Sequence, residues 1–377
     1  MKRLILAGGG HAHLEVLRAA SRRPLRRAEV LLVSPHPEHH YSSMVPGFLQ
    51  RGYREAELTF DLAALSRVAG ATFRCAAADR IDAGGRWVEV GGERIEADLV
   101  SVDVGAVPAG ADEVPGAREH AATVRPMTRA VDLRRRLDAL VGDPDAAPRA
   151  VVVVGGGAAG VEVALAAARR IAEGGAPGTV TLVERETRLL GEYAAPVRAR
   201  VARLLAERGI EVITGRAVVD VTAASARLQD GRLLPAGLVV WLTGAAPSPL
   251  LGASSLALDA RGFLRVDATL RAVEGGAVWG AGDCISLEGH PNLPKAGVYA
   301  VREAPILAHN LRVAIEGGTP RRYVPQPHFL ALLNTADGRA LLRWHRLTSH
   351  SRWAWALKHA IDRRFVRRYQ RLVSPAT

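Results

Sequence analysis

One pattern occurs twice in this chain of 377 residues: an apolar run, a glycine-rich turn and then a helix-forming segment. The first copy covers residues 4–20, and the second, covering residues 150–171, begins about 147 residues later. Each apolar run is typical of a buried parallel strand. Glycines let a backbone approach a diphosphate, and the helix that follows supplies amide donors and the positive end of its dipole. The repeat predicts an α/β fold with two Rossmann-like dinucleotide-binding domains.

The second copy is the more complete one. Gly155, Gly157 and Gly160 have the G-x-G-x-x-G spacing, and the next predicted strand ends at Glu184. A carboxylate at that position accepts hydrogen bonds from a ribose diol and repels a 2′-phosphate, so the pattern favours NADH. Two arginines shortly after Glu184 can hold a phosphate, which leaves NADPH as the alternative.

The first copy departs from the pattern at two positions. His13 stands where the third glycine is expected, and Ser34 stands where an acidic residue is expected. These departures argue against an ordinary NAD site. The turn at Gly8 and Gly10 suits a bound FAD, with the serine hydroxyl or nearby backbone replacing the acid.

A third motif, at residues 277–283, reads as a strand followed by Gly282 and Asp283. An aspartate here can bind a ribityl hydroxyl of a flavin. Together with the two glycine turns and Thr243-Gly244, in this order over about residues 2–310, it resembles the pyridine nucleotide–disulfide oxidoreductases, flavoproteins with two dinucleotide-binding domains.

Within that family the chain is most similar to type II NADH dehydrogenase and sulfide:quinone oxidoreductase. More closely still, it resembles a flavoprotein module fused ahead of selenide, water dikinase in some bacteria. That resemblance rests on residues 6–13, 33–35, 41–47 and 294–299. In that branch serine and histidine are usual at positions 34 and 13. The resemblance implies hydride transfer from NADH to FAD and electron transfer to a quinone-like acceptor.

The resemblance also implies which residues bind the cofactors. On the FAD side they are Gly8, Gly10, His11, Ala12, Ser34, Pro35, Ser43, Met44, Gly105, Gly282, Asp283, Lys295 and Ala296. On the nicotinamide side they are Gly155, Gly157, Gly160, Glu184 and Gly244. Two residues are expected to be catalytic: Glu162 at the junction of nicotinamide and flavin, and Lys295 near the flavin, where a cation stabilises the reduced state. The alternatives are a helix N-terminal acid and a surface lysine.

Only two cysteines occur, Cys75 and Cys284, and their separation in the sequence excludes the closely spaced dithiol of a disulfide reductase. We expect both to be buried structural cysteines in a cytosolic protein. Three histidines, at positions 36, 39 and 40, lie close together, but no second ligand group has zinc-like spacing. We therefore expect no metal, and interpret this segment as a loop that lines the flavin.

The C-terminal segment has a different character, with a hairpin predicted around Asp337-Gly338 and an amphipathic helix predicted over residues 351–372. Its apolar side chains recur every four residues, at Trp353, Leu357, Ile361, Phe365 and Tyr369. Seven cations face one acid, Asp362; they are Arg352, Lys358, Arg363, Arg364, Arg367, Arg368 and Arg371. A basic face beside such a stripe suits an anionic membrane surface. Packing on the protein's own core and a homodimer interface are the alternatives, and no nucleic-acid-binding signature is present.

The domain prediction follows from the motif order. Residues 1–124 and 245–320 form a discontinuous FAD-binding domain, residues 125–244 an NAD(P)H-binding domain, and residues 321–377 an α+β cap with the amphipathic helix. The net charge is +12, almost all of it from arginine. No signal peptide is recognisable, so we expect a cytoplasmic protein or one peripheral to the inner face of the membrane. Two other hypotheses are a soluble flavin-dependent oxidoreductase of selenium or sulfur metabolism and a non-catalytic redox-sensing flavoprotein.

Overall fold

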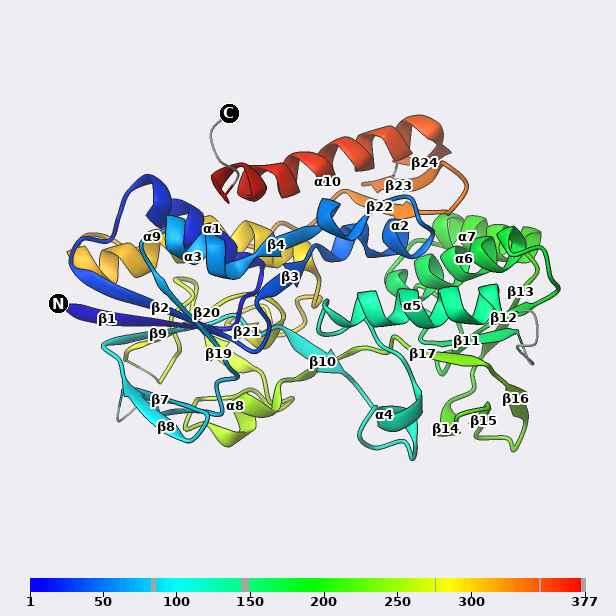
Figure 1. The fold of residues 1–377 in the computed structure, drawn as a ribbon, viewed down its shortest axis with the longest axis horizontal. Helices are drawn as coiled ribbons and strands as arrows, with labels where there is room; N and C mark the ends of the chain where they lie inside the picture. Colours follow the sequence, from blue (N-terminus) through cyan, green and yellow to red (C-terminus); the bar gives the residue numbers. More distant parts are fainter. Residues whose placement is uncertain (83–85, 144–148, 275, 346, 374–377) are drawn as a thin grey trace.

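The computed structural model of the chain describes residues 1–82, 86–143, 149–274, 276–345 and 347–373. Its two largest sheets are parallel and lie in opposite halves of the molecule (Figure 1). The first has the order β20-β9-β1-β2-β5, with bounds Val278–Gly280, Leu99–Val102, Lys2–Ala7, Ala28–Ser34 and Thr72–Cys75. The second has the order β13-β12-β11-β17, with bounds Ile210–Thr214, Thr179–Glu184, Ala150–Val154 and Leu238–Trp241.

The strands that lead into the two glycine turns, β1 and β11, are interior strands of their sheets. The last four residues of β1 and all five of β11 are buried, which explains why these runs show no polar alternation. Each turn opens a helix: α1 (His11–Arg22) after β1 and α6 (Ala158–Glu173) after β11. The helix α9 (Gly297–Glu316) packs against α1. The predicted strand–turn–helix repeat is therefore present in both halves.

The chain passes between the two large parallel sheets at β10 and again at β18, and these two passages pair with each other. The strands β10 (Ala106–Pro108) and β18 (Ala245–Pro247) form an antiparallel ribbon (Figure 1). Soon after β10, Ala122 bridges to Val240 of β17, so the chain already lies against the second sheet there. The division into the predicted FAD-binding and NAD(P)H-binding domains stays a prediction.

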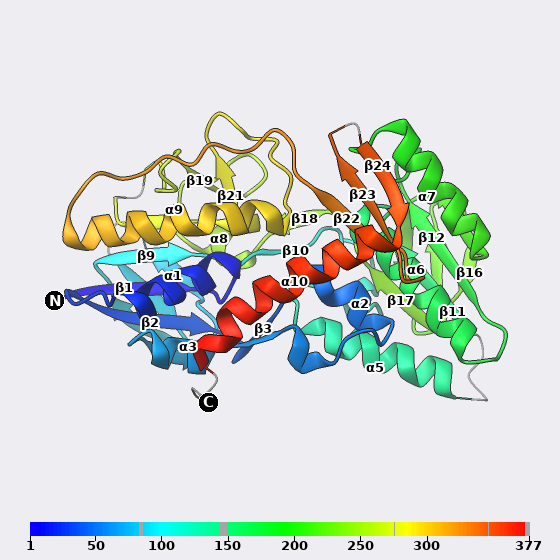
Figure 2. The ribbon, with the colours of Figure 1, turned by 90° about the horizontal axis from the view of Figure 1, so that it is seen from above.

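Residues after 330 form a three-stranded antiparallel sheet and one long helix. The strands are β22 (Ala331–Asn334), β23 (Ala340–Trp344) and β24 (Leu347–Ser351), and α10 (Arg352–Val373) follows at once. The helix extends across the top of the molecule from the β22–β24 sheet to the half that contains β1 (Figures 1 and 2). The predicted hairpin and amphipathic helix are both present. Among the helices within the described ranges, none is both long and apolar enough to cross a bilayer.

Shorter elements complete the structure. The helical ones are η1 (Ser42–Met44), α2 (Val45–Leu49), η2 (Glu55–Glu57), α3 (Leu62–Val68), α4 (Ala117–His120), α5 (Arg129–Gly142), α7 (Ala195–Glu207), α8 (Pro249–Ala253) and η3 (Gly282–Cys284). The strands are β3 (Glu38–His40), β4 (Thr59–Asp61), β6 (Arg80–Asp82), β7 (Trp87–Val90), β8 (Glu93–Glu96), β14 (Val218–Val221), β15 (Ser225–Leu228), β16 (Leu233–Pro235), β19 (Leu264–Val266) and β21 (Ile285–Leu287).

Candidate functional site

In the first glycine turn the backbone packs so closely against Asp103 that a side chain at Gly8 or Gly10 would collide with it. Gly8 has a φ of +97°, and a Cβ there would lie 2.3 Å from the carbonyl oxygen of Asp103. A Cβ at Gly10 would lie 2.3 Å from the carboxylate of the same residue. The turn therefore closes tightly on the segment after β9, and the first amides of α1, which have no partner within the helix, begin there.

His13, at the position of the missing third glycine, has a packing role. Its ring is fully buried, with Nδ1 2.6 Å from the carbonyl oxygen of Gly8 and Nε2 2.8 Å from the hydroxyl of Ser101. Because the carbonyl can only accept, Nδ1 carries the proton and Nε2 accepts from the serine. Burial lowers the pKa of His13 to about 4, so the ring is neutral near pH 7. The histidine ties α1 to its own turn and to β9.

The other residues predicted for FAD lie at the ends of neighbouring elements. Ser34 ends β2, and its hydroxyl lies 3.3 Å from the position of a Cβ at Gly9. Pro35 follows Ser34, and its carbonyl oxygen lies 3.8 Å from the Cys75 thiol. Gly105 has a φ of +68° and open space where its Cβ would be. Met44 is fully buried in η1, and Ala296 caps the N-terminus of α9.

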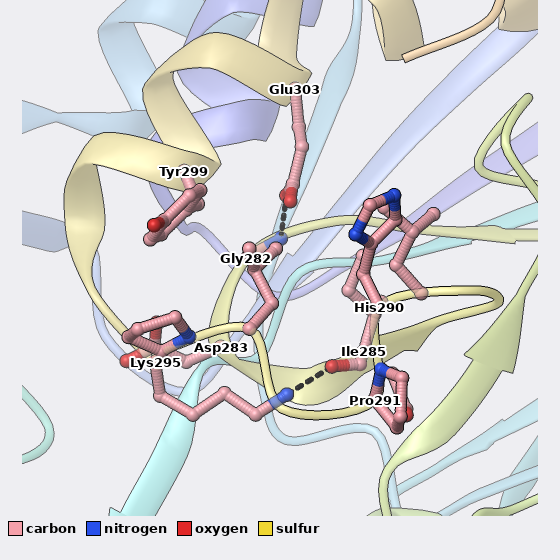
Figure 3. Close-up of a pocket in the computed structure, with 12 residues that line it drawn as sticks. Gly282, Asp283, Ile285, His290, Pro291, Lys295, Tyr299 and Glu303 are labelled. Carbon is pink, nitrogen blue, oxygen red and sulfur yellow. Dashed lines mark hydrogen bonds between the residues drawn. The ribbon is translucent and has the colours of Figure 1, made fainter. Parts of the chain in front are cut away.

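The third motif brings Asp283 to the end of β20, in η3. A carboxylate oxygen of Asp283 lies 3.3 Å from the guanidinium of Arg125. The preceding amide, that of Gly282, donates a 2.6 Å hydrogen bond to Glu303 of α9 (Figure 3). Burial raises the pKa of Asp283, and the nearby Arg125 and Lys295 oppose this shift. The predicted role of Asp283 at a ribityl hydroxyl of the flavin stays a prediction.

Lys295 belongs to the same region and is held there by contacts within the protein. Its amine donates to the carbonyl oxygen of Ile285 (Figure 3). The same amine lies 4.0 Å from the ring centre of Phe263. Burial lowers the pKa of Lys295. The side chain lines a small pocket with Asp283 and Tyr299, so it is not an isolated surface lysine. Its predicted role at the flavin stays a prediction.

The second glycine turn has the close approaches that the full spacing implies. Gly155 has a φ of +113°, and a Cβ there would lie 2.4 Å from the carbonyl oxygen of Leu242. A Cβ at Gly160 would lie 1.8 Å from the carbonyl oxygen of Gly155, so this glycine permits close packing of helix on strand. Gly157 has nothing within 4 Å of its Cβ position, which leaves the N-terminus of α6 open to a ligand.

Glu184 ends β12 beside this turn, as predicted. Its carboxylate accepts hydrogen bonds from the amide of Gly156, at 2.5 Å, and from the amide of Glu186, at 2.9 Å. The guanidinium of Arg185 lies 3.4 Å from the carboxylate of Glu186. Gly244, the remaining residue predicted on this side, accepts a hydrogen bond from Ala109 and has open space at its Cβ position.

Glu162 is the fifth residue of α6, in the second turn of the helix, and faces the C-terminal segment. Its carboxylate accepts a 2.6 Å hydrogen bond from the amide of Asn334, at the end of β22. Burial raises the pKa of Glu162 to about 7, although the positive charge of Lys358 acts in the opposite direction. The group is therefore poised to gain or lose a proton near neutral pH.

Lys358 and Asp362 form a buried ion pair that the sequence analysis did not single out. The lysine amine lies 2.9 Å from the Asp362 carboxylate and donates to the backbone carbonyl and hydroxyl of Ser43, at 2.8 and 2.6 Å. The Ser43 hydroxyl in turn donates to Asp362 at 2.9 Å. The sequence carried a signal for this pair: one of only three lysines stands four residues before the sole acid of an arginine-rich helix.

The prediction that the apolar side chains of α10 form a single stripe is wrong, because they do not all lie on one surface of the helix. Phe365 and Tyr369 are buried, whereas Trp353, Leu357 and Ile361 are 53%, 37% and 41% exposed. Phe365 stacks on the ring of Tyr41 at 4.5 Å and stabilises the first half of the molecule. Lys358, counted with the basic face in the prediction, is buried instead. The helix thus has one anchored side and one free side.

The two cysteines differ from each other. Cys284 is buried, and burial raises the pKa of its thiol to about 12, as expected for a structural cysteine. Cys75 is exposed at the end of β5, so the expectation that it is buried is wrong. Both are free thiols.

The histidine segment includes β3 and contacts the first turn. His39 and His11 meet edge to face at 4.7 Å, and burial lowers the pKa of His11 to about 4. His40 is buried and lies 3.5 Å from Glu55 of η2, which with Glu38 gives three metal-type ligand atoms within 4.8 Å of one another. The carboxylates are exposed, and such groups are common without an ion. The absence of a metal stays a prediction.

Comparison with known proteins fits this architecture. The family described as pyridine nucleotide-disulphide oxidoreductase matches residues 2–304. The chain belongs to this family. An NADH dehydrogenase-like protein of Mycobacterium tuberculosis is 31% identical over 302 residues, covering 75% of this chain and 72% of the relative. The demethylphylloquinone reductase of Synechocystis is 29% identical over 238 residues, covering 60% and 57%.

Solved structures share the fold at low sequence identity. The sulfide:quinone oxidoreductase of Aquifex aeolicus superposes with a TM-score of 0.81 and 19% identity, covering 100% of this chain and 93% of that one. The NDH2 of Plasmodium falciparum, solved with NADH, gives 0.83 and 14%, covering 99% and 97%. The predicted family and fold class are therefore confirmed. Family membership also confirms the prediction of an oxidoreductase that uses FAD and a nicotinamide nucleotide.

Proposed function

We propose that this family member oxidises NADH, with NADPH as the alternative donor, and passes the electrons to a quinone-like acceptor. The observation that carries the proposal is the pair of glycine turns: each follows a strand of its own parallel sheet and leads into a helix. The chain also has no two closely spaced cysteines that could form a redox-active dithiol. Relatives named as NAD(P)H-ubiquinone oxidoreductase and demethylphylloquinone reductase support the choice of acceptor.

The residues at the first turn fit FAD. Backbone closes at Gly8 and Gly10 and open space lies at Gly105, and Asp283 is proposed to bind a ribityl hydroxyl. When bound, FAD supplies hydride acceptance and electron transfer to the second substrate. The chain's part is to hold the cofactor and the nucleotide in position and to exclude water.

Donor preference depends on Glu184 in this proposal. Its carboxylate is held at the end of β12 by two backbone amides, which leaves its outer lone pairs for a ribose diol. Arg185 is paired with Glu186. A 2′-phosphate would meet a fixed negative charge, so NADH is favoured over NADPH.

Glu162 is proposed to hold a proton for the acceptor. Quinone reduction consumes protons, and a carboxyl whose pKa is about 7 donates one at neutral pH more readily than an ordinary glutamate. Lys358 and Asp362 lie close enough to influence the charge of Glu162.

Lys295 is proposed to stabilise negative charge on the reduced cofactor, which requires its amine to leave the carbonyl of Ile285.

The free side of α10 is proposed to contact the membrane where quinones reside. Its first half presents Trp353, Leu357 and Ile361, and its second half presents arginines at the same helical positions. Those exposed arginines are Arg364, Arg368 and Arg371. Apolar side chains enter the interfacial region and arginines bind anionic headgroups.

The electron-transfer proposal is tested with the purified holoprotein under anaerobic conditions. NADH should bleach the visible flavin absorbance, a soluble quinone should restore it, and NADPH should act more slowly. Selenium and sulfur compounds serve as the comparison acceptors. A flavin that neither nucleotide reduces would refute the donor half, and reoxidation by chalcogen compounds but by no quinone would refute the acceptor half.

Membrane contact is tested by co-sedimentation with vesicles that contain phosphatidylglycerol. A variant with Trp353→Ser, Leu357→Ser and Ile361→Ser should lose most binding, because each exposed apolar side chain contributes about 1–2 kcal/mol when it is buried. The control carries Ala356→Ser and Ala360→Ser, two exposed positions of the same helix. Equal binding by both variants would rule out the free side of α10 as the contact.

A further inference from the structure

Three acidic side chains converge beside the first glycine turn; they are Asp103 after β9, Asp283 in η3 and Glu303 in α9. Asp103 is 3% exposed and Glu303 is 1% exposed. Charge repulsion from Asp283 raises the pKa of Asp103, and repulsion from both aspartates raises the pKa of Glu303. We call these three residues the acid cluster.

Asp103 already binds the amides at the start of α1. One of its carboxylate oxygens accepts hydrogen bonds from Ala12, at 2.7 Å, and from His13, at 3.0 Å. The first amides of a helix have no partner within the helix, and in dinucleotide-binding folds they receive the diphosphate. A buried protein carboxylate therefore holds donors that a diphosphate would use.

Glu303 plays the corresponding part at η3, where it accepts from the amide of Gly282 (Figure 3). Both turns close on the acid cluster. A Cβ at Gly10 would lie 2.3 Å from the Asp103 carboxylate, and one at Gly282 would lie 2.8 Å from it. The cluster is thus an integral part of both cofactor-binding turns.

Two cations face the acid cluster, and the three carboxylates outnumber them only above the pKa values of Asp103 and Glu303, where all three are ionised. Arg125 lies 3.3 Å from Asp283, and Lys295 donates to a backbone carbonyl while acting electrostatically on Asp283 and Glu303. His13 of α1 is neutral, and the Cys284 thiol of η3 stays protonated because burial raises its pKa to about 12. A diphosphate would add further negative charge to this excess.

We propose that FAD binding to this chain is coupled to proton uptake by Asp103 and Glu303. These side chains hold α1 and η3 by hydrogen bonds when the cofactor is absent. On binding, whichever of the two carboxyl groups is still ionised takes a proton from the solvent buffer, which removes the repulsion toward the diphosphate. The inference rests on the proposed use of FAD but concerns its retention, not the electron transfer.

The protonation behaviour supports the proposal. Burial raises the pKa of Asp103 to about 7 and that of Glu303 to about 8. A bound anion would raise both values further, so the cofactor-bound state carries more protons than the free state near pH 7 to 9. FAD affinity should therefore fall as the pH rises, by up to about tenfold per pH unit for each proton taken up.

The test follows FAD release from diluted holoprotein by flavin fluorescence at intervals between pH 6 and pH 9. We expect the dissociation constant to rise at least tenfold over this range. Asp103→Asn should flatten the profile and bind FAD more tightly at pH 9, because the amide oxygen still accepts from α1 but carries no charge. Asp112→Asn, at an exposed aspartate, is the matched control and should keep the wild-type profile.

A second measurement does not depend on the folding of a variant. FAD rebinding to the wild-type protein is followed by calorimetry in two buffers with different ionisation enthalpies, and the difference gives the protons taken up. Glu303→Gln should lower that number. A pH-independent dissociation constant, or no proton uptake, would overturn the inference while flavin reduction by NADH upheld the proposed function. Failure to bind FAD at any pH would overturn both.

Discussion

A single histidine performs at the first glycine turn the packing task that glycine performs at the second. Gly160 lets α6 approach within contact of the Gly155 carbonyl, whereas His13 fills its site and joins Gly8 to Ser101 by hydrogen bonds. A sequence motif defined by glycines detects only turns in which the absence of a side chain permits close backbone packing. It does not detect a turn that is stabilised by a buried side chain such as His13.

His13→Ala should destabilise the protein by about 3 kcal/mol, because it opens a cavity and leaves the Gly8 carbonyl and the Ser101 hydroxyl without their partner. Urea denaturation of the wild-type protein and the variant measures the difference. His290→Ala, at an exposed histidine, is the control and should change stability by less than about 0.5 kcal/mol. Equal stabilities would contradict the packing role.

Glu162→Gln should slow reoxidation of the reduced protein by a quinone about 100-fold, the usual range for loss of a general acid. In the wild-type protein the rate should fall as the pH rises through about 7, since the protonated carboxyl is the donor and is lost above its pKa. The variant should lack this step. Stopped-flow measurements from pH 6 to pH 8.5 provide the profile.

The matched control for that experiment is Glu173→Gln, in the last turn of the same helix and exposed to solvent. It should keep both the rate and the pH step. If Glu162→Gln retained the pH-dependent fall in rate, the titrating group would lie elsewhere.

Glu162 was predicted from the sequence because its place after a glycine turn fixes its position on the helix. Its hydrogen bond with Asn334 was not predicted, because the two residues are 172 positions apart in the sequence.

At the scale of the element, α10 shows why a stripe in sequence is not a stripe in space. A step of four residues advances about 40° beyond a full turn, so Trp353 and Tyr369 are separated by about 160° around the helix. The prediction placed both on one face. The helix was therefore recognised correctly, but the partition into buried and exposed sides required the tertiary structure.

Lys358→Met should destabilise the chain by about 3–5 kcal/mol, because it leaves the buried carboxylate of Asp362 without its cation. The double variant Lys358→Met, Asp362→Leu should recover more than half of that loss, since no unpaired charge remains. Denaturant midpoints of the three proteins measure the effect. If the double variant were as unstable as the single one, the loss of stability would come from lost side-chain packing between α10 and the segment at Ser43, and not from the unpaired charge of Asp362.

At the scale of the whole molecule, α10 contacts elements from the first half and from the β22–β24 sheet. A chain that ends at residue 350 loses Phe365, Val366 and Tyr369 from the core, each contributing about 1.5–3 kcal/mol by burial. This sum approaches the whole stability of many domains. We expect the shortened chain to retain little FAD and to unfold at a lower temperature, measured by the flavin-to-protein absorbance ratio and by calorimetry.

A chain that ends at Val373 is the control for that truncation, because it keeps all of α10. Full FAD retention by the shorter chain would show that the helix is not needed to close the site.

The overall arrangement itself was predictable, since buried strands and glycine turns are local signals. The pairing of β10 with β18 and the direction of Lys295 were not, because both depend on groups distant in sequence.

The change along the free side of α10 has a geometric consequence. The apolar side chains at residues 353–361 favour the acyl-chain boundary, whereas the arginines at residues 364–371 favour the headgroup layer. The centres of the two groups lie about half a helix length apart. A helix with these two ends would rest on a bilayer at a slant. Since α10 is fixed to the rest of the protein, that slant would lower the β22–β24 end toward the lipid and raise the opposite end.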